Sequence, residues 1–213
     1  MKGFDYSKLS EGKTYDKLRP LGKKIINCFF KVEYTGLENI PENGGYIIAA
    51  NHVHALDPVI IGLGIENKQI HVMGKQELFK NPIAKAALTK LNGFPVVRGT
   101  RDRQALDYAV RIINEGMILG MFPEGTRSKT FTPAKAKAGV ALIAKEAKAD
   151  VLPVAIYNNE QMKKGSKVTV RFGKPIPFDQ LGLSDESTKD ELRASANAVM
   201  DKIVALWEEG HCE

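Results

Sequence analysis

The chain has 213 residues, an ordinary hydrophobic content of 43% and a formal net charge of +6 at neutral pH. This length suits one domain with a sizeable core, and no apolar run approaches the roughly 20 residues that a membrane-spanning helix needs. The positive charge indicates an anionic partner, which could be phosphate, nucleic acid, an acidic carrier protein or a lipid surface.

Helix and strand patterns alternate along the chain, with no internal repeat or long linker. Helical periodicity occurs at residues 18–30, 58–65, 78–91, 103–115, 136–147 and 187–207. Short apolar runs, typical of buried parallel strands, occur at residues 31–35, 46–50, 69–73, 95–98, 117–122 and 151–157. Residues 167–172 alternate apolar and polar side chains, which predicts a strand with one face in water. We therefore expect a single α/β domain with a mostly parallel central sheet covered by helices.

His52 and Asp57 follow directly on the apolar run at residues 46–50, at the end of an expected strand. A neutral imidazole can take a proton from a hydroxyl, and a carboxylate on its other ring nitrogen fixes the tautomer. At a spacing of five the two side chains would diverge on a continuous helix, so a bend is needed between them. Pro58 favours that bend and also makes Asp57 a candidate helix N-cap. The alternative is a His that only hydrogen-bonds a loop, with Asp57 only capping.

The chain offers no obvious nucleophile of its own. It contains no Gly-x-Ser-x-Gly elbow, and neither Cys28 nor Cys212 has an activating neighbourhood, so a reacting hydroxyl would belong to the substrate. The cysteines suggest neither a disulfide framework nor a zinc site, and His54 and His71 lack ligand-spaced companions, so we expect no bound metal. His54 is best interpreted as a loop residue. The two cysteines fit a reducing compartment. We also expect the protein to stay inside the cell, because its N-terminus lacks the apolar core of a signal peptide.

Cations stand at the end of another expected strand and at the start of an expected helix. Arg98 closes the run at residues 95–98, where its planar guanidinium is suited to phosphate. For that segment alone, a surface Arg after a core strand is the ordinary alternative. Lys135 and Lys137 open the helix expected at residues 136–147, an unfavourable place for cations unless an anion is bound nearby.

The run at residues 117–122 leads straight into the sequence Pro-Glu-Gly-Thr-Arg-Ser. The backbone freedom of Gly125, the hydroxyl of Thr126 and the charge of Arg127 predict an anion cradle at the strand end. Glu124 could orient Arg127 or contact a substrate hydroxyl, and the sequence leaves both open. The same residues are also acceptable as an ordinary turn.

Together these segments resemble the glycerolipid acyltransferase family, whose members convert lysophosphatidic acid to phosphatidic acid. His52 and Asp57 match its His-x4-Asp motif, residues 122–128 match its Phe-Pro-Glu-Gly-Thr-Arg-Ser motif, and residues 151–154 resemble its fourth motif. The Gly-x-x-Phe-x-x-Arg motif is matched only in part, because Phe94 stands one position too early relative to Arg98. The four motifs occur in the family's order, which chance rarely produces.

The resemblance implies a glycerol-phosphate-acyltransferase-like fold and an O-acyltransferase of the 1-acylglycerol-3-phosphate type, acting in phospholipid biosynthesis. His52 would be the general base on the free hydroxyl of lysophosphatidic acid, and Asp57 would orient it, with no acyl-enzyme. Arg98, Gly125, Thr126 and Arg127 would hold the acceptor phosphate, and Glu124 would help to shape that pocket. The donor would be acyl-CoA or an acyl carrier protein, and no other cofactor is required.

Apolar residues recur at helical spacing near the N-terminus, among many Lys and Arg residues: Leu18, Leu21, Ile25, Cys28, Phe29 and Val32. This pattern is typical of a helix in the membrane interface. We therefore expect a membrane-associated segment at residues 1–32 and an acyltransferase domain at residues 33–213, in a protein that is cytoplasmic and peripheral on the inner face of the membrane. A core-packed helix with a basic, solvated face is the alternative. Residues 78–85 are a second candidate for lipid contact.

Other functions fit these residues less well. A nucleic-acid-binding protein would need a recognised module or an aromatic stacking platform, and neither is present in the sequence. A nucleotide-binding protein fails because residues 62–67 and 12–14 fall short of the glycine-rich phosphate loops. An acyltransferase with another acceptor stays open, such as glycerol 3-phosphate, a different lysophospholipid or an amine.

Overall fold

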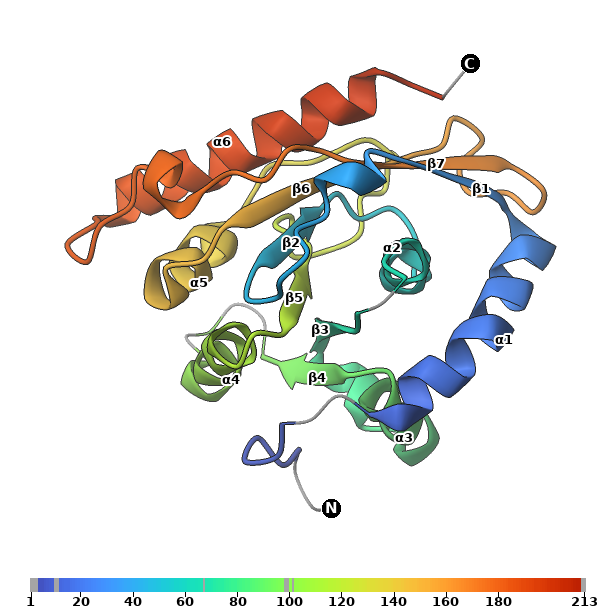
Figure 1. Cartoon of the computed structure of the whole chain (residues 1–213), viewed down its shortest axis with the longest axis horizontal. Helices are drawn as coiled ribbons and strands as arrows, with labels where there is room; N and C mark the ends of the chain where they lie inside the picture. The colour runs from blue at the N-terminus through green and yellow to red at the C-terminus, as the bar shows by residue number, and fades with distance from the viewer. Residues whose placement is uncertain (1–3, 10–11, 67, 98–99, 101, 212–213) are drawn as a thin grey trace.

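The computed structural model describes residues 4–9, 12–66, 68–97, 100 and 102–211. Within them, seven strands form one sheet in the order β1-β7-β6-β2-β5-β3-β4 (Figure 1). The strands are β1 (Lys31–Thr35), β2 (Ile47–Ala50), β3 (Ile70–Lys75), β4 (Gly93–Val96), β5 (Ile118–Met121), β6 (Val151–Tyr157) and β7 (Lys167–Phe172). Neighbouring strands run parallel except β6 and β7, which are antiparallel. The mostly parallel sheet is therefore confirmed.

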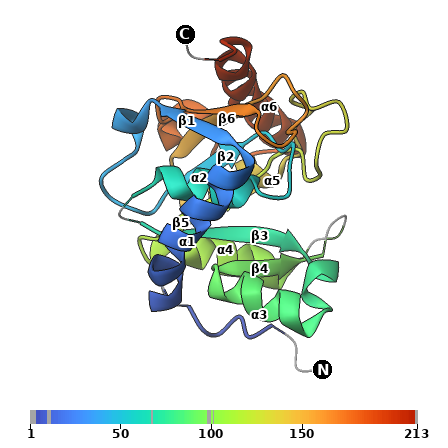
Figure 2. The ribbon, with the colours of Figure 1, turned by 90° about the vertical axis from the view of Figure 1, so that its right-hand side faces the viewer.

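Helices cover both faces of the sheet, as expected for a single α/β domain (Figures 1 and 2). One face carries α1 (Lys13–Phe29) and α2 (Asp57–Gly64). The other carries α4 (Arg103–Asn114), α5 (Gly139–Ala147) and α6 (Lys189–Glu208). Figure 2 shows α3 (Pro82–Lys90) beside β4, at the edge of the sheet. Three short 3-10 helices complete the described elements: η1 (Leu37–Asn39), η2 (Gln76–Phe79) and η3 (Phe178–Leu181).

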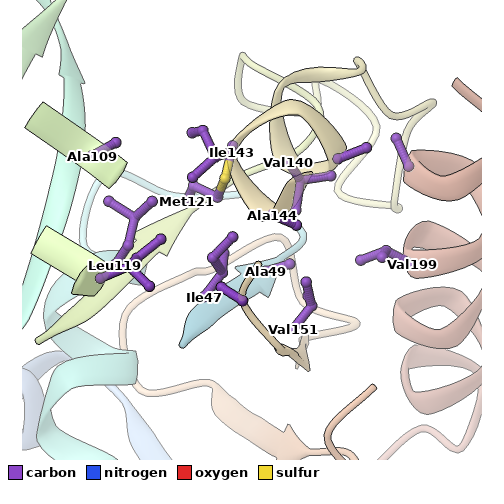
Figure 3. Close-up of a cluster of buried hydrophobic side chains, with 14 of the residues drawn as sticks. Ile47, Ala49, Ala109, Leu119, Met121, Val140, Ile143, Ala144, Val151 and Val199 are labelled. Atoms are coloured by element: carbon purple, nitrogen blue, oxygen red, sulfur yellow. The ribbon is translucent and has the colours of Figure 1, made fainter. Parts of the chain in front are cut away.

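The central strands are buried on both faces, which explains their continuous apolar sequences. Ile47 and Ala49 of β2 face the cluster under α4, α5 and α6, part of which is drawn in Figure 3. Ile48 and Ala50 alternate to the opposite cluster, under α1 and α2. β2 therefore ends in a rigid, fully buried environment, directly before His52.

Two predicted elements have different bounds in the structure. The single helix expected at residues 78–91 is divided into η2 and α3. Asn81 causes the break, because its side chain accepts hydrogen bonds from the amides of Ile83 and Ala84 and so caps α3, with Pro82 in its first turn. The strand expected at residues 95–98 lies earlier, at β4.

The expectation that β7 has one face in water is wrong. Thr169 is fully buried and Arg171 is only 8% exposed, although their types suggested a solvated face. The C-terminal end of α6 and the residues after it cover them. Arg171 pairs with Glu209, at 2.9 Å, and Thr169 shares a hydrogen bond with His211, at 3.1 Å. These two polar residues of β7 are therefore buried with hydrogen-bonding or ionic partners and are not exposed to water.

α1 is docked on the rest of the domain by one face. Ile26 is 1% exposed in the cluster under α1 and α2, and the guanidinium of Arg19 donates to the carbonyl oxygens of Ile65 and Lys68 beyond the end of α2. The strand that follows α1 belongs to the sheet, because β1 pairs with β7 along its length. The boundary expected between residues 32 and 33 therefore falls inside β1. None of the helices in the described residues is both long and apolar enough to cross a membrane.

Candidate active site

The sheet topology brings the first and third motifs to one place. β2 and β5 are adjacent and parallel, with Ala49 opposite Met121. His52 lies just beyond the end of β2, and Phe122 just beyond the end of β5, so both leave the sheet at its carboxyl edge. That edge is where open α/β sheets bind their ligands.

Asn51 fixes the chain just before His52. Its side-chain amide donates to the carbonyl oxygen of Ile156 on β6, at 2.9 Å, and accepts from the amide of the same residue, at 2.7 Å. Asn51 is fully buried, so this pair extends the contact of β2 with β6 one residue beyond the strand. Sequence reasoning assigned no role to Asn51, and its position next to His52 was the only available signal.

His52 and Asp57 are in contact. The Nδ1 atom of His52 lies 2.7 Å from Oδ2 of Asp57, which is fully buried. The chain bends between them, and the amide of Asp57 donates to the carbonyl oxygen of His54, as the spacing required. A carboxylate only accepts hydrogen bonds, so Nδ1 carries the proton of a neutral ring and Nε2 is left to accept one. His54 lies in that bend, as predicted for a loop residue.

Asp57 does not cap α2, so that expectation is wrong. The helix begins at Asp57 itself, with Leu56 at the N-cap position and no side-chain cap. Oδ2 of Asp57 instead accepts hydrogen bonds from the amides of Val53, at 2.7 Å, and His54, at 2.8 Å. The carboxylate therefore organises the loop that precedes it, and it ties that loop to the His52 ring.

The segment after β5 surrounds His52 with three further contacts. The ring of Phe122 stacks on the imidazole, with centroids 4.0 Å apart and planes inclined by 18°. Oε1 of Glu124 accepts from the amide of His52, at 3.1 Å, and the amide of Ser128 donates to the carbonyl oxygen of His52, at 2.7 Å. Sequence reasoning did not foresee these contacts, because nothing local in either segment reveals that β2 and β5 are neighbours.

Glu124 is buried, although its neighbours in the loop are exposed or half-buried. It is 3% exposed, and burial raises the pKa of its carboxyl group, while hydrogen bonds from the amides of His52 and Ala134 oppose that shift. No hydrogen bond or ion pair joins Glu124 to Arg127 in the part of the chain that the structure describes. The partners of Glu124 are therefore main-chain amides, including that of His52.

The loop at Gly125, Thr126 and Arg127 is the segment for which the sequence predicts an anion cradle. Gly125 has a φ of +71°, which favours glycine, and a Cβ atom there would lie 3.0 Å from Nζ of Lys137. Thr126 and Arg127 are exposed. Because α5 begins at Gly139, Lys137 lies in the loop before the helix and does not open it as predicted. Two cations, Arg127 and Lys137, therefore lie in or beside this loop.

The remaining predicted phosphate ligand, Arg98, lies outside the described residues. The strand before it, β4, ends at Val96 and is parallel to β3, so its carboxyl end is on the same edge of the sheet as the ends of β2 and β5.

Among the residues that the structure describes, no cluster of three or more His, Cys, Asp or Glu side chains could hold a metal ion.

Comparisons with known proteins agree with this geometry. The family model described as Acyltransferase matches residues 31–157, which contain His52, Asp57 and the loop after β5. A 1-acyl-sn-glycerol-3-phosphate acyltransferase of Bacillus subtilis (strain 168) is 32% identical over 188 residues, covering 86% of this chain and 92% of the relative. A protein of the same name from Streptococcus pneumoniae is 31% identical over 183 residues, covering 83% of this chain and 66% of that protein.

A solved structure has the same architecture. The crystal structure of the 1-acyl-sn-glycerophosphate (LPA) acyltransferase PlsC from Thermotoga maritima matches 92% of this chain and 78% of its own, with a TM-score of 0.71 and 27% sequence identity. The family model spans more than half of the chain, and the relative from Bacillus subtilis is covered almost completely. The chain belongs to the acyltransferase family.

Proposed function

We propose that this protein transfers a fatty acyl group from an acyl thioester to the free hydroxyl of lysophosphatidic acid, forming phosphatidic acid. The observation that carries the proposal is the 2.7 Å contact between Nδ1 of His52 and the buried carboxylate of Asp57, at the carboxyl edge of the sheet. The names of the relatives from Bacillus subtilis and Streptococcus pneumoniae support this choice of acceptor.

In this mechanism His52 is the general base. Nε2 takes the proton of the acceptor hydroxyl as its oxygen attacks the thioester carbonyl carbon, and Asp57 stabilises the imidazolium that forms. The tetrahedral intermediate then collapses, the carbon–sulfur bond breaks, and the imidazolium returns the proton to the leaving thiolate. The new ester bond is the only bond that the acceptor gains, so no acyl-enzyme and no protein nucleophile are needed.

The exposed loop after β5 is suited to the acceptor phosphate. Glu124 and Ser128 both contact the main chain of His52, so the three residues between them form a loop next to the base. Arg127 makes no ion pair with any residue that the structure describes, which leaves its guanidinium available for a phosphate. Lys137 adds a second charge beside Gly125, and we assign Arg98 to the same group.

The assay that tests this function uses purified protein with acyl-CoA or acyl carrier protein donors and a panel of acceptors. Lysophosphatidic acid is compared with glycerol 3-phosphate, other lysophospholipids and an amine, and each product is identified by mass. We expect phosphatidic acid to be the main product. Preferential acylation of another acceptor would reassign the substrate, and the absence of transfer to every acceptor would reject the proposal.

Replacing Arg127 with alanine should lower kcat/KM for lysophosphatidic acid by about 10- to 100-fold, because a charge-assisted hydrogen bond contributes roughly 1.5–3 kcal/mol. The KM for the acyl donor should change much less. The matched control is Arg193→Ala, which removes an exposed Arg from α6, outside the loop after β5. An unchanged preference for phosphorylated over dephosphorylated acceptor in Arg127→Ala would contradict this role.

We also propose that α1 contacts the membrane surface. Leu21, Ile25 and Phe29 are spaced by four residues and are 53%, 45% and 43% exposed, while Ile26 faces the core. Exposed lysines surround this apolar row, at positions 17, 23 and 24. Apolar residues flanked by cations are the pattern of a helix that binds an anionic leaflet.

A second apolar surface lies next to α1. Leu78 is 53% exposed and Ile83, at the start of α3, is 80% exposed, within the second predicted lipid-contacting segment. A groove of about 550 Å³ lies between α1 and α3 and is lined by Leu18, Pro82, Ile83, Ala86, Ala87, Lys90 and Leu91. None of these residues belongs to the His52 site, so the groove fits the proposed membrane contact and not the catalytic centre.

The double variant Ile25→Asp with Phe29→Asp should release the protein from anionic vesicles and lower activity on membrane-embedded acceptor. Burial of the apolar row supplies the part of binding that salt does not screen, while each nearby Lys adds up to about 1 kcal/mol. Activity on a short-chain soluble acceptor should be kept.

The matched control places the same two charges, also four residues apart, on the exposed face of α6: Ala194→Asp with Ala198→Asp. Vesicle co-sedimentation measures the binding of both variants. If the folded Ile25→Asp/Phe29→Asp protein sediments like the parent protein, α1 does not make the membrane contact.

A further inference from the structure

We infer that Phe122 and Glu124 are positioning residues for the His52 base, and that Glu124 acts on the reaction through His52 without binding the acceptor. This inference rests on the proposed function, because it takes His52 as the general base. It assigns to the start of the loop after β5 a different task from that of Gly125, Thr126 and Arg127, which are exposed or half-buried and can reach a ligand.

The first step concerns the main chain of His52. Beyond the end of β2, the strand ladder no longer holds the chain, and Asn51 supplies the last contact with β6. The two main-chain polar groups of His52 are instead bonded to the loop after β5, its amide to Glu124 and its carbonyl oxygen to Ser128. The position of the base therefore depends on that loop.

The second step concerns the imidazole ring. The contact with Asp57 fixes one point of the ring, at Nδ1, but a single hydrogen bond leaves the tilt of the ring plane free. Phe122 covers one face of the ring at 4.0 Å and nearly parallel, so the imidazole cannot tilt towards that side without a clash. Asp57 and Phe122 together therefore fix where Nε2 points.

The third step concerns the chemistry of Glu124. Glu124 is 3% exposed. Its Oε1 atom is bonded to the amide of His52, and its Oε2 atom is closed off from solvent, so an acceptor hydroxyl would have to open the loop to reach either oxygen. Its useful property is then an acceptor oxygen at Oε1, which a glutamine side chain also offers. A role in substrate binding would instead depend on the negative charge.

Positioning and binding differ in their kinetics. A positioning residue acts on the geometry of the transition state, so its loss lowers kcat and leaves the acceptor KM nearly unchanged. A residue that binds the acceptor equally in the ground state and the transition state raises KM when it is removed. The two kinetic constants for lysophosphatidic acid, measured at saturating donor, therefore separate the two roles.

For Phe122, we expect Phe122→Leu to lower kcat by about tenfold or more, since small misplacements of a reacting group can cost as much as about a hundredfold. Phe122→Tyr keeps a flat ring and should restore most of the loss. Phe131→Leu is the matched control, because Phe131 is also partly buried, packs against the same apolar cluster and lies in the same loop. An unchanged kcat in folded Phe122→Leu would overturn the role of Phe122.

For Glu124, we expect Glu124→Ala to lower kcat by about 10- to 100-fold, because it leaves the half-buried amide of His52 without this partner and frees the base to move. Glu124→Gln should keep most of the activity, since it still accepts from His52. If Glu124→Gln is as impaired as Glu124→Ala, or if the acceptor KM rises while kcat stays constant, Glu124 binds the acceptor and the inference is wrong.

NMR of the same variants tests the inference without any substrate. The stacked ring of Phe122 should shift the carbon-bound protons of the His52 imidazole upfield, and Phe122→Leu should remove that shift while Phe122→Tyr keeps it. Exchange of the His52 amide should be slow in the parent protein and in Glu124→Gln, and fast in Glu124→Ala. Failure of the parent protein to acylate lysophosphatidic acid would reject the proposed function alone, whereas unchanged imidazole shifts and amide exchange in Phe122→Leu and Glu124→Ala would reject this inference.

Discussion

Replacing His52 with alanine should lower acyl transfer by at least about a hundredfold, the usual scale for the loss of a general base. In the proposed mechanism, the imidazole is the group that takes the proton of the acceptor hydroxyl. Asp57 holds Nδ1, Phe122 covers one face, and Nε2 is left for the acceptor hydroxyl. The rate of phosphatidic acid formation at saturating donor and acceptor measures the effect.

The fold should survive this change, because the His52 side chain makes one hydrogen bond and its main-chain bonds to Glu124 and Ser128 are kept. A thermal melt checks this. His54→Ala is the matched control, since it removes a half-buried imidazole from the same loop and keeps the His54 amide that donates to Asp57. Near-normal turnover in a folded His52→Ala protein would contradict the mechanism.

The contact between His52 and Asp57 could be predicted from the sequence because its signals are local. A buried strand at residues 46–50, a His just after it and a Pro that forces a bend all lie within one short segment. Local geometry then makes the contact, since only four residues separate His52 from Asp57. The N-cap role of Asp57 failed for a local reason too, because the amides of the preceding loop bind the carboxylate first.

The contacts of Phe122 and Glu124 with His52 could not be predicted, because they depend on the strand order. β3 and β4 lie between β2 and β5 in the sequence, yet β2 and β5 are neighbours in the sheet. Nothing in the periodicity of a strand specifies its neighbour. Glu124 was therefore interpreted by its residue type, as a possible substrate ligand, and not by what surrounds it.

Patterns of apolar and polar residues also proved incomplete where a second element covers a surface. In β7 the alternation of apolar and polar residues predicted a face exposed to water. Arg171 is instead buried, and it forms an ion pair with Glu209, directly after α6. In α1 the sequence shows the apolar row, but it does not show whether that row faces the core or the solvent. The helix packs on the domain through Ile26 and Arg19, so the predicted row at Leu21, Ile25 and Phe29 is the outer one.

Asp57 should show the other large effect, because its carboxylate serves both the fold and the reaction. Asp57→Ala removes the acceptor of three hydrogen bonds, from the His52 ring and from the amides of Val53 and His54. The buried amide of Val53 and the half-buried amide of His54 then lack a partner. An unpaired buried group costs roughly 1–3 kcal/mol and a half-buried one costs less, so the free energy of unfolding should fall by about 2–4 kcal/mol. Oδ1 of Asp57 has no partner among the described residues, and its removal offsets part of this loss.

Asp57→Asn separates the two tasks of this carboxylate. The amide oxygen of asparagine can still accept from Val53 and His54, so the unfolding free energy should stay much closer to that of the parent protein than in Asp57→Ala. Activity should nevertheless fall by at least about a hundredfold, because a neutral amide neither stabilises the imidazolium nor selects the tautomer with a free Nε2. Chemical denaturation and the acyl-transfer rate are measured on both variants. If Asp57→Asn keeps near-normal activity, the carboxylate charge is not needed, and Asp57 serves only to shape the loop.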